Sequence, residues 1–110
     1  MIKEIADYMR EIESEYCFIA LRGDEKDVEV GEILDNSKDL FEGDTYGMEL
    51  DGTSAYLIAD LDNAEQEIER FFSDYLYHNI SVVTGQSYSY GDDQNEVIIP
   101  YCKVLRTWSR

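Results

Sequence analysis

Residues 53–78 read TSAYLIADLDNAEQEIERFFSDYLYH, and this stretch decides the fold class because it joins a strand pattern to a helix pattern. Its first seven residues are mostly apolar, which predicts a central strand over residues 53–59. Asp62 then has capping-box spacing, with Glu65 three residues later, so we expect a helix to begin at Asp62. A wide apolar stripe at helical spacing continues to about His78. A strand that leads into an amphipathic helix indicates a mixed α and β protein.

Three further elements are predicted on the N-terminal side of this stretch. Residues 2–14 place apolar side chains at helical spacing, which predicts an amphipathic helix. Residues 16–21, with the sequence YCFIAL, form a short apolar run whose length and aromatic content favour a buried strand. Residues 28–33 nearly alternate but contain Gly31, so we expect a short or bulged strand there.

The rest of the chain supplies a loop and two strands. Residues 35–52 are rich in Asp, Asn, Ser and Gly with little periodicity, which predicts a long loop. Residues 80–90 and 96–108 are predicted to be strands joined by a hairpin loop, with Pro100 at an edge or a bulge. The length predicts one domain over residues 1–110. We therefore expect an α+β fold in which two amphipathic helices pack on a small, mainly antiparallel sheet, in the order α-β-β-loop-β-α-β-β.

The net charge of the chain limits the classes of partner that it can bind. It has 25 acidic and 9 basic residues, a formal net charge of −16. Repulsion among so many like charges costs stability, so a need for solubility alone does not account for it. We expect the protein to avoid nucleic acid and anionic membranes and to bind a basic protein surface. The alternative is an ordinary acidic protein from an acid-rich or halophilic proteome.

The hydropathy of the chain and its two cysteines both bear on its cellular location. No apolar run approaches the ~20 residues that cross a bilayer, and acidic residues occur where a signal peptide would be apolar. We therefore expect a cytoplasmic protein. Cys17 and Cys102 are expected to be reduced, buried thiols rather than a disulfide.

The sequence carries no enzyme signature. His78 is the one histidine, placed where it would interact with a helix C-terminus, and Cys17 has apolar neighbours. Asp60 and Asp62 resemble the start of a calcium loop, but Ala64 stands where the third ligand belongs, which favours a turn and a helix cap. We expect no catalytic activity, cofactor or metal. A small enzyme that uses a carboxylate pair is the third hypothesis.

The acidic residues of the first predicted helix are ordered. Glu4, Asp7, Glu11 and Glu15 are spaced by three, four and four residues, so they form one narrow stripe opposite the apolar face. At 1.5 Å rise per residue, neighbouring carboxylates lie roughly 4.5–6 Å apart along the axis. Duplex DNA presents one phosphate per ~3.4 Å on each strand. Such a row suits a basic groove built for phosphates; a solvated helix face is the alternative.

The predicted loop combines acids with aromatic residues, a composition that suits an interface with steering charges and apolar anchors. The predicted loop also contains Asp35 among its acids, and Met48 beside its aromatic residues. The alternative is that the aromatic residues and Met48 close over the core while the acids stay solvated. The loop residues expected to contact a partner are Asp39, Phe41, Glu42, Asp44, Tyr46, Glu49 and Asp51.

In length, charge and lack of an enzyme signature, the chain resembles small acidic anti-defence proteins of phages and mobile elements, the anti-CRISPR and anti-restriction DNA mimics. Residues 30–34 and 49–54 also resemble a segment of uncharacterised mobile-element proteins. The resemblance implies a bacterial host cell. The leading hypothesis is an acidic inhibitor that mimics nucleic acid and blocks the DNA- or RNA-binding groove of a host defence nuclease complex, a CRISPR effector in the first instance.

The second hypothesis is a structural or assembly protein of a phage or mobile element. It would bind a basic partner, or itself as a homodimer, through the Tyr-rich C-terminal hairpin. Tyr88, Tyr90 and Tyr101 fall on alternating positions and would form an aromatic patch across the strands. Packing within the sheet is the alternative, and we favour it for Tyr101.

Overall fold

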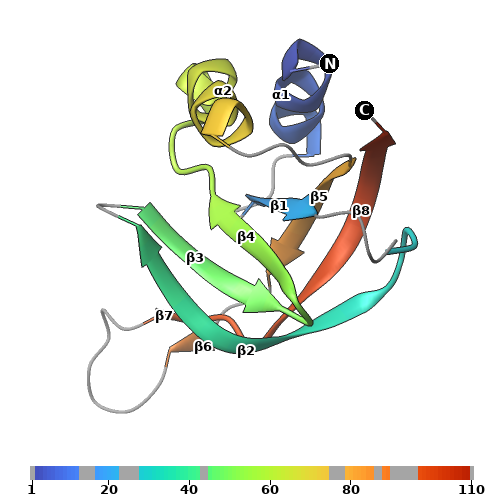
Figure 1. Cartoon of the computed structure of the whole chain (residues 1–110), viewed down its shortest axis with the longest axis vertical. Coiled ribbons are helices and arrows are strands. Elements are labelled where there is room, and N and C mark those ends of the chain that lie inside the picture. Colours follow the sequence, from blue (N-terminus) through green and yellow to red (C-terminus); the bar gives the residue numbers. More distant parts are fainter. Residues whose placement is uncertain are drawn as a thin grey trace.

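The computed structural model of the chain describes residues 2–12, 17–22, 28–42, 45–74, 79–85, 88–89 and 97–109. Figure 1 shows two helices on one side of a curved sheet. The elements in chain order are α1 (Ile2–Ile12), β1 (Cys17–Arg22), β2 (Ile33–Glu42), β3 (Thr45–Leu50), β4 (Thr53–Leu57), a 3₁₀ turn η1 (Leu61–Asn63), α2 (Ala64–Asp74), β5 (Asn79–Gly85), β6 (Tyr88–Ser89), β7 (Val97–Ile98) and β8 (Tyr101–Ser109).

Six antiparallel strands close into a barrel in the order β1-β4-β3-β2-β8-β5. The expected fold class, α+β with two amphipathic helices on a small sheet, is therefore wrong. The sheet closes because β1 pairs with β4 on one side and with β5 on the other, while β2 pairs with both β3 and β8. Apart from the hairpin of β2 and β3, these pairings join segments far apart in the sequence, which local patterns do not report.

The predicted long loop over residues 35–52 is also wrong, because most of this stretch forms the hairpin of β2 and β3. Glu42 and Thr45 are the last paired residues at the hairpin's closed end. The next turn, between β3 and β4, contains Asp51 with φ 49° and Gly52 with φ 81°. Two successive residues with positive φ are typical of the type I′ turn of a β-hairpin, for which Asp-Gly is a preferred pair.

The segment before β2 differs from its prediction as well. A strand was expected over residues 28–33, but residues 30 and 31 form a turn and β2 begins only at Ile33. Gly31 has φ 93°, a backbone conformation that suits glycine. Its N–H donates to the carbonyl of Val104 at 2.8 Å, which fixes the turn against β8.

The apolar side chains form two cores, one inside the barrel and one outside it. Phe18 and Ala20 of β1 belong to the inner core, whereas Cys17 and Ile19 face outward against the helices. Strand β1 is therefore buried on both faces, which explains its uninterrupted apolar sequence and confirms the prediction of a buried strand. The outer core is completed by both helices, through residues that include Ile5, Ala6, Met9, Ala64 and Ile68.

Both predicted helices are present, over Ile2–Ile12 and Ala64–Asp74. Residues 13–16 and 75–78, which include His78, lie outside the described residues. Helix α2 follows the turn η1, whose N-cap is Asp60, two residues before the predicted cap at Asp62. Neither helix, each 11 residues long, is long and apolar enough to span a membrane, and the described residues contain no other α-helix.

The C-terminal strands pair as a hairpin, as predicted, through β5 and β8. The short strands β6 and β7 pair separately as a two-stranded sheet, and the predicted hairpin loop over residues 91–95 lies outside the described residues. Pro100 lies between β7 and β8, outside both strands, where its carbonyl accepts from the N–H of Asn36 at 2.9 Å. Cys17 and Cys102 are both buried, as predicted, and no disulfide joins them.

Candidate functional site

Three of the predicted carboxylates lie on the solvent side of α1. Glu4, Asp7 and Glu11 are all exposed. On the opposite face, Ile5 and Met9 are completely buried against the outside of the barrel. Because packing fixes the helix, the carboxylates form a row along one side of it, with neighbours about 4.5–6 Å apart along the axis.

Arg10 connects α1 to α2 through hydrogen bonds. Its Nη1 donates to Oε1 of Glu65 at 2.8 Å and its Nη2 donates to Oε2 of Glu65 at 2.5 Å. Its Nε donates to the carbonyl of Leu61 at 2.8 Å. The hydrogen bonds from Arg10 lower the pKa of Glu65 from an ordinary value of 4.5 to about 2. Because Nη1 also lies 3.3 Å from Asp7, the middle carboxylate of the row is partly neutralised.

In the turn before α2, the side chain of Asp60 accepts hydrogen bonds that stabilise the turn. Oδ1 of Asp60 accepts from the N–H of Asp62 at 3.1 Å, and Oδ2 accepts from Nδ2 of Asn63 at 2.7 Å. The favoured interpretation of this segment, a turn and a helix cap, is confirmed. The described residues contain no group of three or more His, Cys, Asp or Glu side chains that could hold a metal ion.

The hairpin of β2 and β3 holds its acids in a hydrogen-bond network. Oδ1 of Asp39 accepts from the hydroxyl of Tyr46 at 2.8 Å and from Nδ2 of Asn36 at 3.0 Å. The ring of Tyr46 packs edge-on against Phe18, with 6.1 Å between ring centroids. Burial, followed by the bond to Asp39, raises the pKa of Tyr46 above its usual range. Tyr46, predicted as an anchor for a partner, thus packs against the inner core, and Met48 lies within that core.

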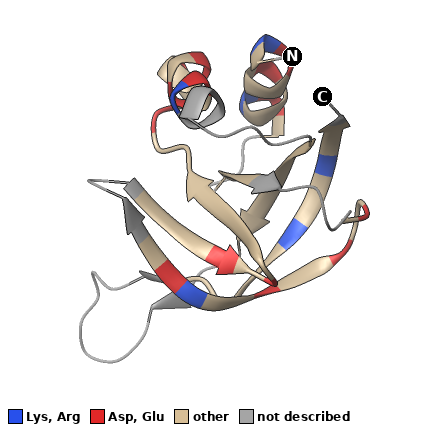
Figure 2. Ribbon diagram, viewed as in Figure 1, with Lys and Arg blue, Asp and Glu red and all other residues tan. Residues whose placement is uncertain are grey.

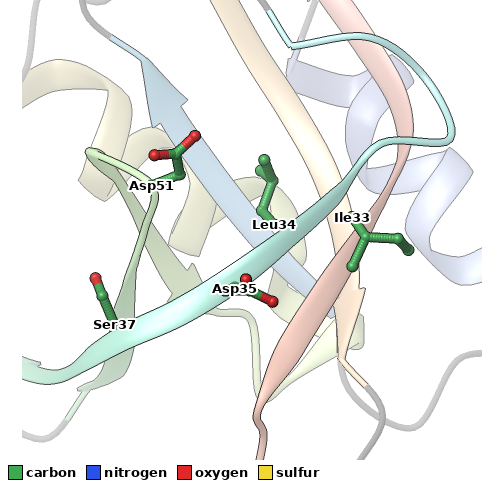
Figure 3. A pocket seen from close by; sticks show the side chains of 5 residues that line it. All are labelled: Ile33, Leu34, Asp35, Ser37 and Asp51. Atoms are coloured by element: carbon green, nitrogen blue, oxygen red, sulfur yellow. The ribbon is translucent and has the colours of Figure 1, made fainter.

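A hollow of about 300 Å³ opens where β2 changes its partner strand. Residues Ile33 to Asp35 pair with β8, whereas the pairing with β3 begins at Asn36 and is interrupted by a bulge before Lys38. The hollow lies between this part of β2 and the β3–β4 turn. Figure 3 shows the described residues that line it, from β2 and from the turn: Ile33, Leu34, Asp35, Ser37 and Asp51.

One wall of the barrel has the opposite charge. Residues 79–85 and 97–109 contain no acidic residue, and Lys103 and Arg106 of β8 are both exposed. Figure 2 shows this contrast, with acidic residues on both helices and along β2 and β3 and only basic ones on β8. The guanidinium of Arg106 lies 4.8 Å above the ring of Trp108 and 5.5 Å above that of Tyr8, where cation–π attraction holds it.

The structure does not bring the two predicted acidic sets together. In the ring of six strands, β2 stands three places from β1, so the hairpin and the helices lie on different sides of the barrel. Glu49 is half-buried opposite Lys38. Phe41 and Glu42 end β2, where they pair with β3. Glu15 and Asp44 lie outside the described residues.

Sequence reasoning missed the residues that build the hollow and the corner beside it. The composition around Asn36 and Ser37 predicts a loop, and no local pattern connects the apolar residues Ile33 and Leu34 to Asp51. The signal that could have found them is the Asp51-Gly52 pair, because Asp-Gly between two runs with alternating apolar residues predicts a tight hairpin.

Comparison of the chain with protein-family models, with curated proteins and with solved structures gives no match.

Proposed function

We propose that this protein is an inhibitor that mimics nucleic acid and occupies the DNA- or RNA-binding groove of a host defence nuclease complex. A CRISPR effector in the cytoplasm of a bacterial host is the case to test first. The mechanism is competitive, because carboxylates take the positions of phosphates on basic side chains of the groove. This function requires no catalytic group on the inhibitor.

The observation that supports the proposal best is the carboxylate row on α1. Its spacing of about 4.5–6 Å is comparable with the ~3.4 Å between phosphates along one strand of a duplex. Glu4 and Glu11 project into solvent while Ile5 and Met9 are buried, so the row is held in place before a partner arrives. Groups ordered in advance lose less entropy on binding.

The distribution of charge supports the same function. None of the acidic side chains whose burial the structure describes is buried. They therefore contribute to the field around the protein, and a strong field of one sign raises the rate of encounter with a surface of the opposite sign.

The test reverses the charge of the row without disturbing the helix. In the variant Glu4→Lys/Glu11→Lys, Asp7 is kept because it contacts Arg10. The control, Glu29→Lys/Glu69→Lys, makes the same change of net charge at two other exposed positions. Purified CRISPR effector complexes are incubated with labelled target DNA and increasing amounts of each variant.

We expect the row variant to lose about tenfold or more in inhibition, because steering changes association rates by ~10–10³. The control should keep most of its inhibition. Equal losses in both variants would indicate diffuse attraction only. The proposal would be rejected if neither the parent protein nor the control inhibited any effector, with effectors of different types tested.

A second function is favoured by the acid-free wall of the barrel. Lys103 and Arg106 on β8 are complementary to the acidic hairpin of another copy of the chain. This arrangement supports an assembly protein that binds itself. Sedimentation at low and high salt tests this function, because an assembly held by these charges dissociates as salt screens them. A monomer at both salt concentrations contradicts it.

A further inference from the structure

We infer that the outer face of the β2–β8 ladder is the interface of a symmetric dimer of this chain. The inference rests on the second proposed function in one respect, since that function already requires self-association. Leu34 and Cys102 are paired across this ladder and belong to the inner core. Because side chains alternate along a strand, their neighbours on both strands face outward. These neighbours are Ile33, Asp35, Tyr101 and Lys103.

The four outward residues are arranged so that their charges lie on one diagonal. Ile33 lies opposite Lys103, and Asp35 lies opposite Tyr101. Diagonal neighbours on two paired strands are roughly 7–8 Å apart. A two-fold axis along the other diagonal, from Ile33 to Tyr101, therefore exchanges the positions of Asp35 and Lys103. In a dimer built on this axis, the Asp35 carboxylate of each copy faces the Lys103 ammonium of the other copy, and the two Ile33 side chains meet.

The apolar side chains of this face are exposed in the single chain. Among the residues whose burial the structure describes, the exposed large apolar side chains are Val30, at 65%, and Ile33, at 52%. Val30 lies beside β8, because the N–H of Gly31 donates to the carbonyl of Val104 at 2.8 Å. Neighbouring apolar side chains that stay exposed are typical of a contact surface. A second copy would bury them at the centre of the interface.

The charges of the face are available to a second copy. Asp35 and Lys103 are both exposed, and neither forms a hydrogen bond or an ion pair in the described part of the structure. Figure 2 shows acidic residues on the segment that leads into β2 and basic residues alone on β8. A face that carries both signs at exchangeable positions is complementary to itself, which favours a second copy over an unrelated partner. A face of one sign would repel its own copy.

The experiment measures sedimentation of the full chain at concentrations up to ~1 mM. The buffer contains ~0.15 M salt, where the Debye length is about 8 Å, so that the repulsion between two chains of charge −16 is screened. We expect a reversible equilibrium between monomer and dimer without larger species, since a two-fold interface closes after two copies.

One variant tests the apolar centre without changing the charge. Ile33→Ser should weaken dimerisation about tenfold, because both copies lose an apolar contact at the axis. The side chain is 52% exposed in the single chain, so the fold should be retained. The control, Glu69→Gln, changes an exposed position on α2 and should dimerise like the parent.

Two charge reversals test the pairing between copies. Asp35→Lys and Lys103→Asp should each weaken dimerisation about tenfold or more, because each variant places like charges face to face across the axis. An equimolar mixture of the two variants should dimerise again, since every lysine then faces an aspartate of the other copy. The mixture has the same total charge as two parent chains, so diffuse repulsion is unchanged. The melting temperature of each variant is measured alongside.

The inference is overturned if the parent stays monomeric up to ~1 mM, if Ile33→Ser dimerises like the parent, or if a mixture of charge variants that melt like the parent dimerises no better than either variant alone. If a charge variant does not melt like the parent, Ile33→Ser decides. Association that survives all these changes but dissociates as salt rises would support the second proposed function and reject this interface. Nuclease inhibition is measured separately, so neither result affects the proposal for the α1 row.

Discussion

Arg10 and Glu65, 55 positions apart in the chain, are joined by two hydrogen bonds between a guanidinium and a carboxylate. The pair fixes α1 against the start of α2, and both helices then cover the outer core. Because the hydrogen bonds require an ionised Glu65, the pair also connects the packing of the helices to pH.

The first prediction follows from the lowered pKa of Glu65. Its pKa is about 2 in the folded protein against an ordinary 4.5. A lowered folded pKa means that the stabilisation is present above pH ~4.5 and is lost as the pH falls towards ~2. The variant Glu65→Gln should be less stable than the parent at neutral pH, and this difference should shrink over that window.

Urea unfolding of both proteins from neutral pH to about pH 2 measures the difference directly. Glu69→Gln serves as the control, since its difference from the parent should not show this dependence. A difference for Glu65→Gln that is the same at all pH values would contradict the assignment.

The second prediction concerns the total charge. With a net charge of −16, repulsion opposes folding, and both ion pairs found among the described residues involve Arg10. The melting temperature should therefore rise when salt is raised from a low concentration to ~0.15 M, where the Debye length is about 8 Å. Calorimetry measures the change. An unchanged melting temperature would show that the charges are compensated locally.

The third prediction concerns the corner at Asn36. Its side chain donates to the carbonyl of Ile99 at 2.9 Å and to Asp39, and it accepts from the N–H of Lys38 at 3.1 Å. Asn36→Ala should lower the free energy of unfolding by about 1–3 kcal/mol, because the partly buried carbonyl loses its donor. Ser37→Ala, which removes one exposed hydrogen bond, should cost less. Chemical denaturation of both variants tests this order, and the reverse order would reject the role given to Asn36.

The fourth prediction concerns the thiols. Burial raises the pKa of Cys102 to about 12, and its Sγ lies 3.6 Å from the sulfur of Met48. A thiol needs its thiolate form to react, so Ellman's reagent should label Cys102 slowly in the folded protein. Both cysteines are buried and should react together on unfolding. Rapid labelling of the native protein at Cys102 would contradict the barrel core described above.

The elements that the sequence predicts correctly are those with a local signal. Apolar residues at helical spacing, which include Ile5 and Met9, predict α1, and the uninterrupted apolar run around Phe18 predicts β1. These patterns depend on neighbours within a few positions, so they are visible without the tertiary structure. The exposed carboxylates on α1 could be predicted for the same reason.

The hairpin was missed because its composition resembles a loop. Gly47, which suggested a turn, lies inside β3, where a Cβ atom would fall 2.7 Å from the carbonyl of Ala55 and 2.9 Å from the ring of Tyr56. Glycine is needed there for close approach rather than for a turn. Apolar residues do recur at every second position from Tyr46 through Met48 to Leu50, but polar and glycine neighbours obscure this alternation.

Barrel closure and the hollow depend on pairings that no local pattern contains. Strand β2 exchanges β8 for β3 as its partner at Asn36, which only the register across distant strands reveals. The same is true of the contact between Arg10 and Glu65.

Closure of the barrel also has a consequence for self-association. Each of the six strands has a hydrogen-bonded neighbour on both sides over part of its length, and the stretches paired on both sides are not available as a template for fibril growth. The short pair of β6 and β7 stands apart from this ring. Among the described strands, addition of a foreign strand is thus limited to the stretches paired on one side only, such as the part of β2 beyond Asn36, and to the pair of β6 and β7.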